Sequence, residues 1–336
     1  MLSNVLGHEK VKRVLVGSYM ENRVGHAYIF EGPKGVGRQT AAIEFAKLLL
    51  CENPKDGEPC GGCKSCSMCR AGSHPDLQIV TNQLYDETKK STDVLVDTVR
   101  NMKKDIFIKP YLAERKLYVM PSADTMNAHA QNSLLKVLEE PPEYCTIILI
   151  AENSNLFLPT ILSRAVPVRF FPLSEADVEG FLKKQFPELG ESTAAVASLS
   201  GGCIGRATEL AEDDEVMQLR NELFSGVLAL SGRGKRSIYD FMLFLKHSKE
   251  NIKLVFDILQ GLFRDLLRIK QSNSTDGILN RDKVSELGQI AEKIRTDAPV
   301  RMLEILIRYT EYLARNISLA QVSQCMSLEL WEVMHD

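Results

Sequence analysis

The stretch GHAYIFEGPKGVGRQT, residues 25–40, decides the fold of this chain. An apolar run at 26–31 leads into a glycine-rich loop and a helical pattern begins at 37, which is the context of a phosphate-binding loop. In the pattern G-x-x-x-x-G-K-[ST], backbone amides surround the phosphates, the lysine reaches the outer ones and the hydroxyl binds magnesium. Here arginine and glutamine replace the lysine and the hydroxyl residue. The candidate nucleotide-binding residues, a degenerate set, are Gly32, Gly35, Gly37, Arg38, Gln39 and Thr40.

Short apolar runs alternate with helical patterns through the first half of the sequence. Short apolar strands separated by helices predict a parallel sheet covered on both faces. The fold class is therefore α/β, with a five-stranded parallel sheet in a domain spanning residues 1–171. We expect strands at 26–31, 77–80, 116–120, 146–151 and 166–171, and helices that include 37–50, 94–104 and 127–139.

The strand pattern ends after Pro172. LSEADVEGFLKKQF begins with a Ser-x-x-Asp capping pattern and predicts an amphipathic helix, and two shorter helices follow it. From about residue 213, apolar residues recur at three- and four-residue steps, and a polar run at 271–277 separates two helices. We expect a small helical domain at 172–212 and a larger all-helical domain at 213–336.

Composition and charge limit the class of protein and its expected location in the cell. The chain has 336 residues, 44% of them hydrophobic, and a net charge of −3. That charge argues against a protein that binds nucleic acid alone through a strongly cationic face. The first residues lack a signal-peptide core, and no stretch reaches the ~18 to 20 apolar residues of a membrane span. We therefore expect a cytoplasmic protein with no membrane partner.

Five of the eight cysteines lie within residues 51–69. Close C-x-x-C steps let thiolates converge on one metal ion, and four thiolates are typical of a structural zinc site. Reduced cysteines in a metal-free loop are the alternative. We expect the three isolated cysteines, at 145, 203 and 325, to be small core residues. The expected zinc ligands are Cys51, Cys60, Cys63 and Cys66, with Cys69 as a substitute.

The ordered motifs GHAYIFEGPKGVGRQTAAIEFAKLLLC, AGSHPDL, LLKVLEEPP and LPTILSRA resemble those of the delta-prime family, AAA+ subunits of the bacterial DNA polymerase III clamp loader, in its zinc-module version. The resemblance covers residues 1 to about 210 and continues faintly through 264–267 and 316–319. It implies an AAA+ sheet domain with an inserted zinc module, a helical lid and a C-terminal collar within a hetero-oligomer. Its implied partners are gamma or tau and delta subunits and, indirectly, the sliding clamp and primed DNA during DNA replication.

The resemblance also makes the degenerate motifs interpretable. An AAA+ ATPase ends its third strand with two carboxylates that hold magnesium-bound water. Pro121 and Ser122 occupy those places here, and Asp124 is expected to cap a helix that starts near Thr125. Without the lysine, the hydroxyl and the carboxylates, most of the electrostatic stabilisation of phosphoryl transfer is missing. We expect an accessory polymerase subunit with no ATPase activity and no ATP in its own site; phosphate binding by the loop amides is the alternative.

Arg164, in LPTILSRA, is expected to act catalytically in the ATP site of a neighbouring subunit. Family members share a Ser-Arg-Cys motif here, whose arginine reaches across a subunit boundary into an ATP site, and Ala165 replaces the cysteine. Such an arginine finger neutralises charge on the transferred phosphoryl group and is worth ~10³ to 10⁵ in rate. An ordinary surface arginine paired with a nearby acid is the alternative.

Other positions and other functional classes are less well supported. Asn153 or Asn155 could contact a γ-phosphate or act as a cap or turn residue. The sensing arginine of an active relative falls at Gly205, with Arg206 one place later. His26 and His129 are expected to be structural.

Two rival functions follow from parts of the sequence. An ATP-binding motor subunit of the gamma/tau type would need the intact loop and the acidic pair. A zinc-dependent DNA-binding module would need basic residues around the cysteines, where only Lys55, Lys64 and Arg70 occur.

Overall fold

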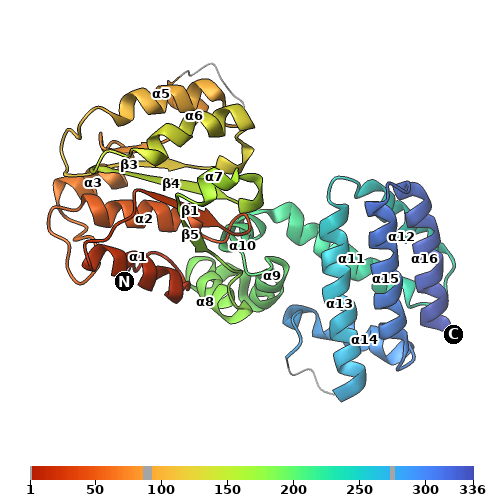
Figure 1. Ribbon diagram of the computed structural model, residues 1–336. Helices are drawn as coiled ribbons and strands as arrows, with labels where there is room; N and C mark the ends of the chain where they lie inside the picture. The colour runs from red at the N-terminus through yellow and green to blue at the C-terminus, as the bar shows by residue number, and fades with distance from the viewer. Residues whose placement is uncertain (1, 86–92, 273–276) are drawn as a thin grey trace. The chain divides into compact units, whose positions relative to one another are not determined.

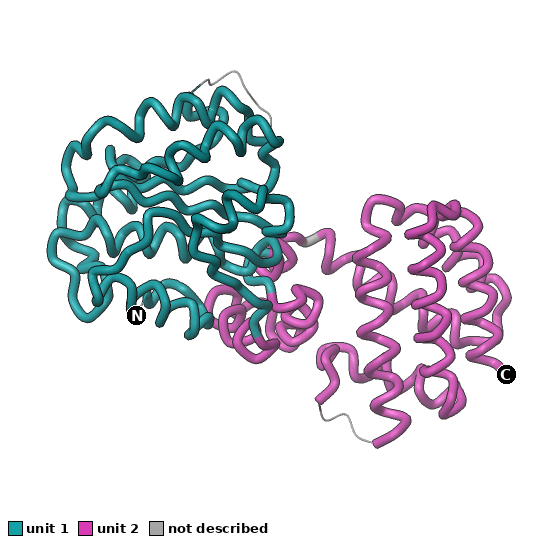
Figure 2. The backbone as a smooth tube through the Cα atoms, in the orientation of Figure 1, with its two compact units in different colours: residues 1–173, 203–205 teal, residues 174–202, 206–336 magenta. Residues whose placement is uncertain are grey.

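The computed structural model describes residues 2–85, 93–272 and 277–336. The chain forms two compact units (Figure 2). Unit 1 contains residues 1–173 and 203–205, and unit 2 contains 174–202 and 206–336. Among the described residues, no helix combines the length and the apolar character needed to cross a bilayer.

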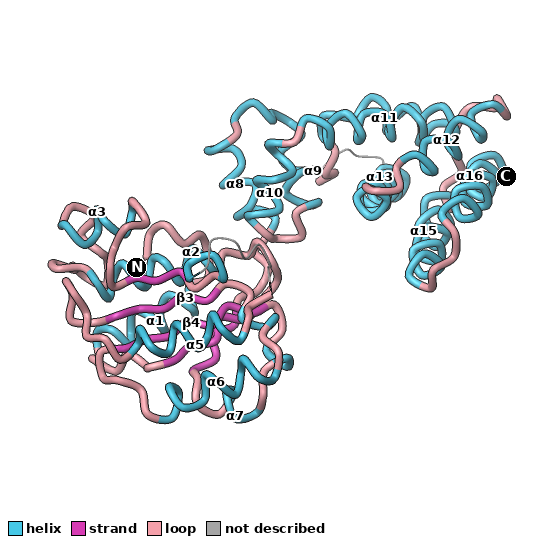
Figure 3. Tube along the Cα trace, turned by 90° about the horizontal axis from the view of Figure 1, so that it is seen from above, coloured by secondary structure: helices cyan, strands magenta, loops and turns pink. Residues whose placement is uncertain are grey.

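Unit 1 is built on a five-stranded parallel sheet in the order β2-β3-β4-β1-β5 (Figure 1). The predicted α/β fold with a five-stranded parallel sheet is confirmed. In the described chain, strands occur only in unit 1, where Figure 3 shows them in magenta. The strands are β1 (Ala27–Glu31), β2 (Leu77–Ile79), β3 (Lys116–Met120), β4 (Cys145–Ala151) and β5 (Val166–Arg169).

Helices cover both faces of the sheet, which explains the continuous apolar run of β4. Ile147 and Leu149 pack with residues of α5 and α6, whereas Ile148 and Ile150 pack with residues of α1 and α2. Every residue of β4 is buried because alternate side chains enter opposite cores. The helices of unit 1 are α1 (Glu9–Met20), α2 (Arg38–Leu50), α3 (Lys64–Arg70), α4 (Asn82–Tyr85), α5 (Val96–Ile106), α6 (Ala128–Glu139) and α7 (Pro159–Leu162).

The expected cap after β3 is wrong. Asp124 lies in a short 3-10 turn, η1 (Ala123–Thr125), and its Oδ2 accepts the N–H of Glu152 at 2.7 Å. The next α-helix, α6, begins at Ala128, and the side chain of Asn127 caps it by accepting the N–H of Ala130 at 2.9 Å. The carboxylate of Asp124 therefore ties the end of β3 to the loop after β4 instead of starting a helix.

Unit 2 contains helices and no strand in its described residues. Its core of buried aliphatic and aromatic side chains extends through α11 to α16. The predicted division of this region at residue 213 stays a prediction. The helices are α8 (Glu175–Gln185), α9 (Thr193–Leu199), α10 (Ile204–Glu212), α11 (Asp214–Leu230), α12 (Arg236–His247), α13 (Ile252–Ser272), α14 (Val284–Lys293), α15 (Ala298–Ala314) and α16 (Leu319–His335).

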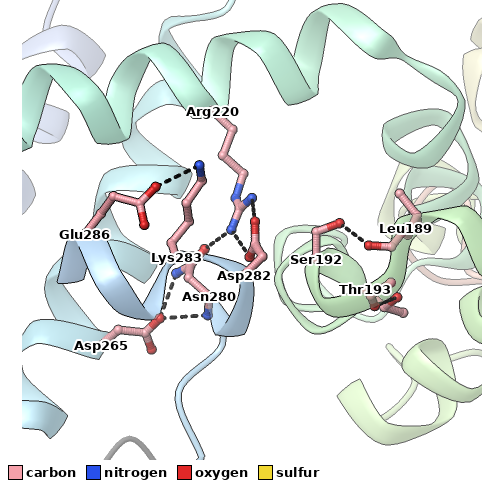
Figure 4. A network of polar contacts seen from close by, with 10 residues as sticks. Leu189, Ser192, Thr193, Arg220, Asp265, Asn280, Asp282, Lys283 and Glu286 are labelled. Atoms are coloured by element: carbon pink, nitrogen blue, oxygen red, sulfur yellow. Dashed lines mark hydrogen bonds and ion pairs between the residues drawn. The ribbon is translucent and has the colours of Figure 1, made fainter. Parts of the chain in front are cut away.

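A buried polar network fixes α11 to the segment that follows α13 (Figure 4). Arg220 is 1% exposed; its guanidinium donates to both carboxylate oxygens of Asp282, at 2.6 and 2.7 Å, and to Oδ1 of Asn280 at 2.8 Å. Asp265 accepts the backbone N–H groups of Leu279 and Asn280, at 3.0 and 2.9 Å. These charges are paired, which makes their burial tolerable.

Two further expectations, on the polar connection at 271–277 and on the isolated cysteines, are confirmed only in part. The polar connection at 271–277 falls partly on α13, which extends to Ser272, and its residues 273–276 lie outside the described residues. Of the isolated cysteines, Cys145 and Cys203 are buried as expected, but Cys325 is exposed. It lies on the outer side of α16, where apolar neighbours in the sequence point inward and it does not.

Candidate functional site

The glycine loop connects β1 to α2, as the sequence predicts. Gly32 has φ +154°, and a Cβ there would lie 2.5 Å from the backbone oxygen of Phe170 at the end of the sheet. A side chain at this position would force the loop away from the sheet. The sharp turn is therefore required by packing alone, whether or not a phosphate ever enters it.

Two contacts hold the carbonyl groups of this loop. His8 Nε2 lies 2.9 Å from the carbonyl oxygen of Val36, and the N–H of Gly205 donates to the carbonyl oxygen of Gly35 at 2.8 Å. A Cβ on Gly205 would lie 2.9 Å from the Cα of Gly35. The position where an active relative would carry its sensing arginine is thus in backbone contact with the loop.

Sequence reasoning missed His8. Its backbone is left-handed, with φ +56°, and its ring lies edge-on to Phe170 with centroids 5.0 Å apart. Burial lowers the pKa of His8, so the ring is kept neutral and can share a hydrogen bond with the Val36 carbonyl. The left-handed backbone, which is uncommon outside glycine, asparagine and aspartate, could not be read from the sequence.

Arg38, the first residue of α2, is buried at 8% exposure. Desolvation lowers the pKa of its guanidinium, and the negative charges of Glu152 and Asp124 act in the opposite direction. The cation in the lysine position is therefore buried, and two carboxylates of its own chain act on it electrostatically. Gln39 and Thr40, in the next places of the loop pattern, are exposed.

Two places correspond to functional sites of an ATPase: the positions after β3, where it carries catalytic carboxylates, and the asparagines after β4, which could contact a γ-phosphate. Pro121 and Ser122 directly follow β3, and Ser122 has a left-handed backbone with φ +54°. The side chain of Asn153 accepts the N–H of Asn155 at 2.9 Å and caps the short 3-10 turn η2 (Ser154–Leu156). Asn153 therefore acts as a cap, one of the two roles the sequence allowed.

Arg164 lies between α7 and β5, at 34% side-chain exposure. Its Nη2 is 3.0 Å from Oε1 of Glu139, and its Nη1 donates to the carbonyl oxygen of Thr160 at 2.9 Å and to Oγ of Ser163 at 3.2 Å. The side chain is accessible at the surface but is held by groups of its own chain. Its predicted role in a neighbour's site stays a prediction.

The four cysteines predicted as ligands come together. The sulfur atoms of Cys51, Cys60, Cys63 and Cys66 all lie within 4.8 Å of one another, and those of Cys51 and Cys63 are 4.0 Å apart. With Zn–S bonds of about 2.3 Å, the sulfurs of a tetrahedral site are separated by about 3.8 Å. This donor set could hold a metal ion with no more than small adjustments.

Backbone donors stabilise the thiolate of Cys60, whereas burial raises the pKa values of the Cys51 and Cys66 thiols. The N–H of Cys60 points at the sulfur of Cys51 at 3.2 Å, and that of Cys63 points at the sulfur of Cys60 at 3.3 Å. The N–H groups of Gly62 and Cys63 lower the pKa of Cys60 to about 6. Deprotonated sulfur is the form that binds a metal.

Cys69 does not join the cluster. Its side chain is buried with Ala46, Leu50 and Leu117, and burial raises the pKa of its thiol to about 11. Cys69 is therefore a core residue of α3, and its possible use as a substitute ligand would require the helix to move.

A hydrogen-bonded chain that sequence reasoning did not assign begins beside the cysteines. Ser65 Oγ, in the first turn of α3, is 3.0 Å from Nε2 of His74, and His74 Nδ1 accepts the N–H of Asp76 at 3.1 Å. The fully buried carboxylate of Asp76 accepts the N–H groups of Tyr111, Leu112 and Ala113 at 2.7, 2.7 and 2.9 Å. The SHPDL motif thus links the cysteine module to the loop before β3.

Comparison with known proteins adds the family. A family model described as DNA polymerase III, delta subunit matches residues 7–174, and one described as its C terminal part matches residues 214–321. The DNA polymerase III subunit delta' of Bacillus subtilis (strain 168) is 29% identical over 328 residues, covering 96% of each chain. Subunit tau of the same organism is 27% identical over 326 residues, covering 90% of this chain and 56% of tau.

A solved structure gives a weaker match. A gamma subunit-related protein of Thermotoga maritima covers 97% of this chain and 99% of its own at 19% identity, with a TM-score of 0.40. The family models are stronger evidence than this structural match. The first alone spans half of the sequence, and the second matches most of the C-terminal helices. The chain belongs to the DNA polymerase III delta subunit family.

Proposed function

We propose that this chain is the delta-prime type of clamp-loader subunit, without ATPase activity of its own. The observation that carries the proposal is Arg38, which occupies the lysine position of the loop and is 8% exposed. The negative charges of Asp124 and Glu152, which act on this guanidinium, would oppose the binding of a phosphate beside it. The similar identities to delta' and tau, 29% and 27%, do not separate the two types, so the residues of the loop must.

Hydrolysis would need groups that the described site lacks. Phosphoryl transfer depends on positioned cations and on carboxylates that hold magnesium-bound water. Proline and serine follow β3, and the Asp124 carboxylate is engaged by the backbone N–H of Glu152. These features support an inactive loader subunit over the alternative of an ATP-binding gamma/tau-like motor.

Phosphate release from Mg·ATP by the purified chain tests this assignment. We expect none above background, and none from the double variant Arg38→Lys/Gln39→Thr, because the residues after β3 are unchanged. Robust magnesium-dependent turnover by the wild-type chain that is lost in Arg38→Ala would overturn the proposal. Titration with a fluorescent ATP analogue tests binding without hydrolysis and is expected to show no saturable signal.

The proposal includes a part played in trans. Arg164 would supply the positive charge that a neighbouring gamma or tau ATP site needs during clamp loading. In a loader reconstituted with gamma or tau and delta, Arg164→Ala is expected to slow ATP turnover stimulated by clamp and primed DNA. Arg23→Ala is the matched control, because Arg23 is also a surface arginine paired with an acid, Glu21, at 3.5 Å. Equal rates for the two variants would remove Arg164 from the mechanism.

The remaining parts of the proposal concern support and assembly. Cys51, Cys60, Cys63 and Cys66 would hold one structural Zn²⁺ with no open coordination position, since four thiolates complete a tetrahedron. Residues 172–212 would form the lid and residues 213–336 the collar of a cytoplasmic hetero-oligomer that acts on the sliding clamp and primed DNA. Elemental analysis of the purified chain should give one zinc per chain, and Cys63→Ser should lose it.

A further inference from the structure

Glu139, the partner of Arg164, lies in an electrostatically unfavourable place. It is the last residue of α6, where the helix dipole favours cations, and Glu140 follows it. Arg164 is the cation that pairs with it, with Nη2 3.0 Å from Oε1 of Glu139. The two side chains are 34% and 49% exposed, so neither is locked in a core.

The guanidinium of Arg164 is shared between three acceptors of its own chain. Nη1 donates hydrogen bonds to Thr160 and Ser163, and Nη2 forms the ion pair with Glu139. A phosphate needs the same donors, because guanidinium groups bind carboxylates and phosphates with the same forked geometry. A forked contact of Nη1 and Nη2 with a phosphate outside the chain therefore competes with the ion pair to Glu139.

We propose that Glu139 is a positioning residue that holds Arg164 within its own chain until a neighbour's triphosphate displaces it. This inference rests on the proposed role of Arg164 in trans. Exposed ion pairs are weak, so the retention amounts to about two- to fivefold in the fraction of Arg164 that is free. A weak hold suits the role, because the highly charged phosphates can still displace the carboxylate.

The test uses the complete reconstituted loader and measures ATP turnover without clamp or DNA. Glu139→Gln is expected to raise this basal rate about two- to fivefold. Glu140→Gln, which removes the same charge from the adjacent exposed residue, is expected to leave the rate unchanged. A Glu139→Gln rate equal to or below wild type would overturn the proposal.

A double-mutant cycle separates this role from a structural one. In an Arg164→Ala background, Glu139→Gln should have no effect on turnover, because the group it retains is gone. A rise that persists in that background would refute the proposal. The two proposals also fail differently. Arg164→Ala with wild-type turnover rejects the arginine finger, whereas slow Arg164→Ala combined with a silent Glu139→Gln rejects only the retention by Glu139.

Discussion

Replacing Asp76 with asparagine should loosen the loop before β3, and the size of the effect follows from three hydrogen bonds. The carboxylate accepts the N–H groups of Tyr111, Leu112 and Ala113. A hydrogen bond to a charged group contributes about 1.5 to 3 kcal/mol, and a neutral one about 0.5 to 1.5. Asparagine would weaken all three bonds and turn its NH₂ group toward at least one N–H. Relief of the buried charge offsets part of this loss, which leaves a net cost of roughly 3 kcal/mol.

Hydrogen exchange is the suitable assay, because a chain of two units need not unfold in a single step. A cost of roughly 3 kcal/mol raises the exchange rate of amides 111–113 about a hundredfold in Asp76→Asn. Glu114→Gln is the control, because Glu114 is exposed in the same segment. If the two variants exchange within threefold of each other at these amides, the carboxylate does not organise the loop and the reasoning fails.

Three further predictions concern the remaining buried groups. Arg220→Met should lower the free energy of opening around α11 by about 3 kcal/mol, because it leaves Asp282 without its cation, whereas the exposed Arg236→Met should change it little; equal hydrogen-exchange rates of the α11 amides in the two variants would contradict this. Because burial lowers the pKa of His8, its contribution to stability is present above about pH 6.5 and is lost as the pH falls through the lowered value. Unfolding of His8→Asn should therefore depend less on pH between 7 and 5 than that of the wild type, and parallel profiles would exclude His8 as the group responsible. If Cys51, Cys60, Cys63 and Cys66 hold a metal ion, a chelator should raise exchange throughout residues 51–69 while leaving α16 unchanged, and identical exchange with and without chelator would contradict a structural metal site.

The elements that could be predicted are those whose signal is local. The runs that became β1, β3 and β4 are fully or almost fully buried, and a strand buried on both faces is apolar throughout, so its position can be read directly. The cysteine cluster can also be predicted from the sequence, because its ligands are close together along the chain. The spacing alone does not show whether Cys69 is a ligand, because its C-x-x-C step matches those of the other cysteines. Only its packing against Leu50 and Leu117 separates it from them.

What could not be predicted depends on contacts between distant residues. Aspartate is a common helix-capping residue, but the carboxylate of Asp124 accepts a hydrogen bond from the backbone N–H of Glu152, 28 residues away. His74 and Asp76 were visible as part of a family motif, yet their roles depend on Ser65 and on the loop at 111–113. Glu139 became relevant only when the fold placed it beside Arg164.

The contact between Gly205 and Gly35 has an evolutionary consequence. Restoring the lysine, the hydroxyl and an acidic pair would take several substitutions, yet none of them would open the space that a side chain at 205 needs, because its first carbon would meet the Cα of Gly35 at 2.9 Å. A side chain at 205 would therefore require the backbone around Gly35 or Gly205 to shift. Main-chain packing at this contact therefore limits which substitutions position 205 can accept.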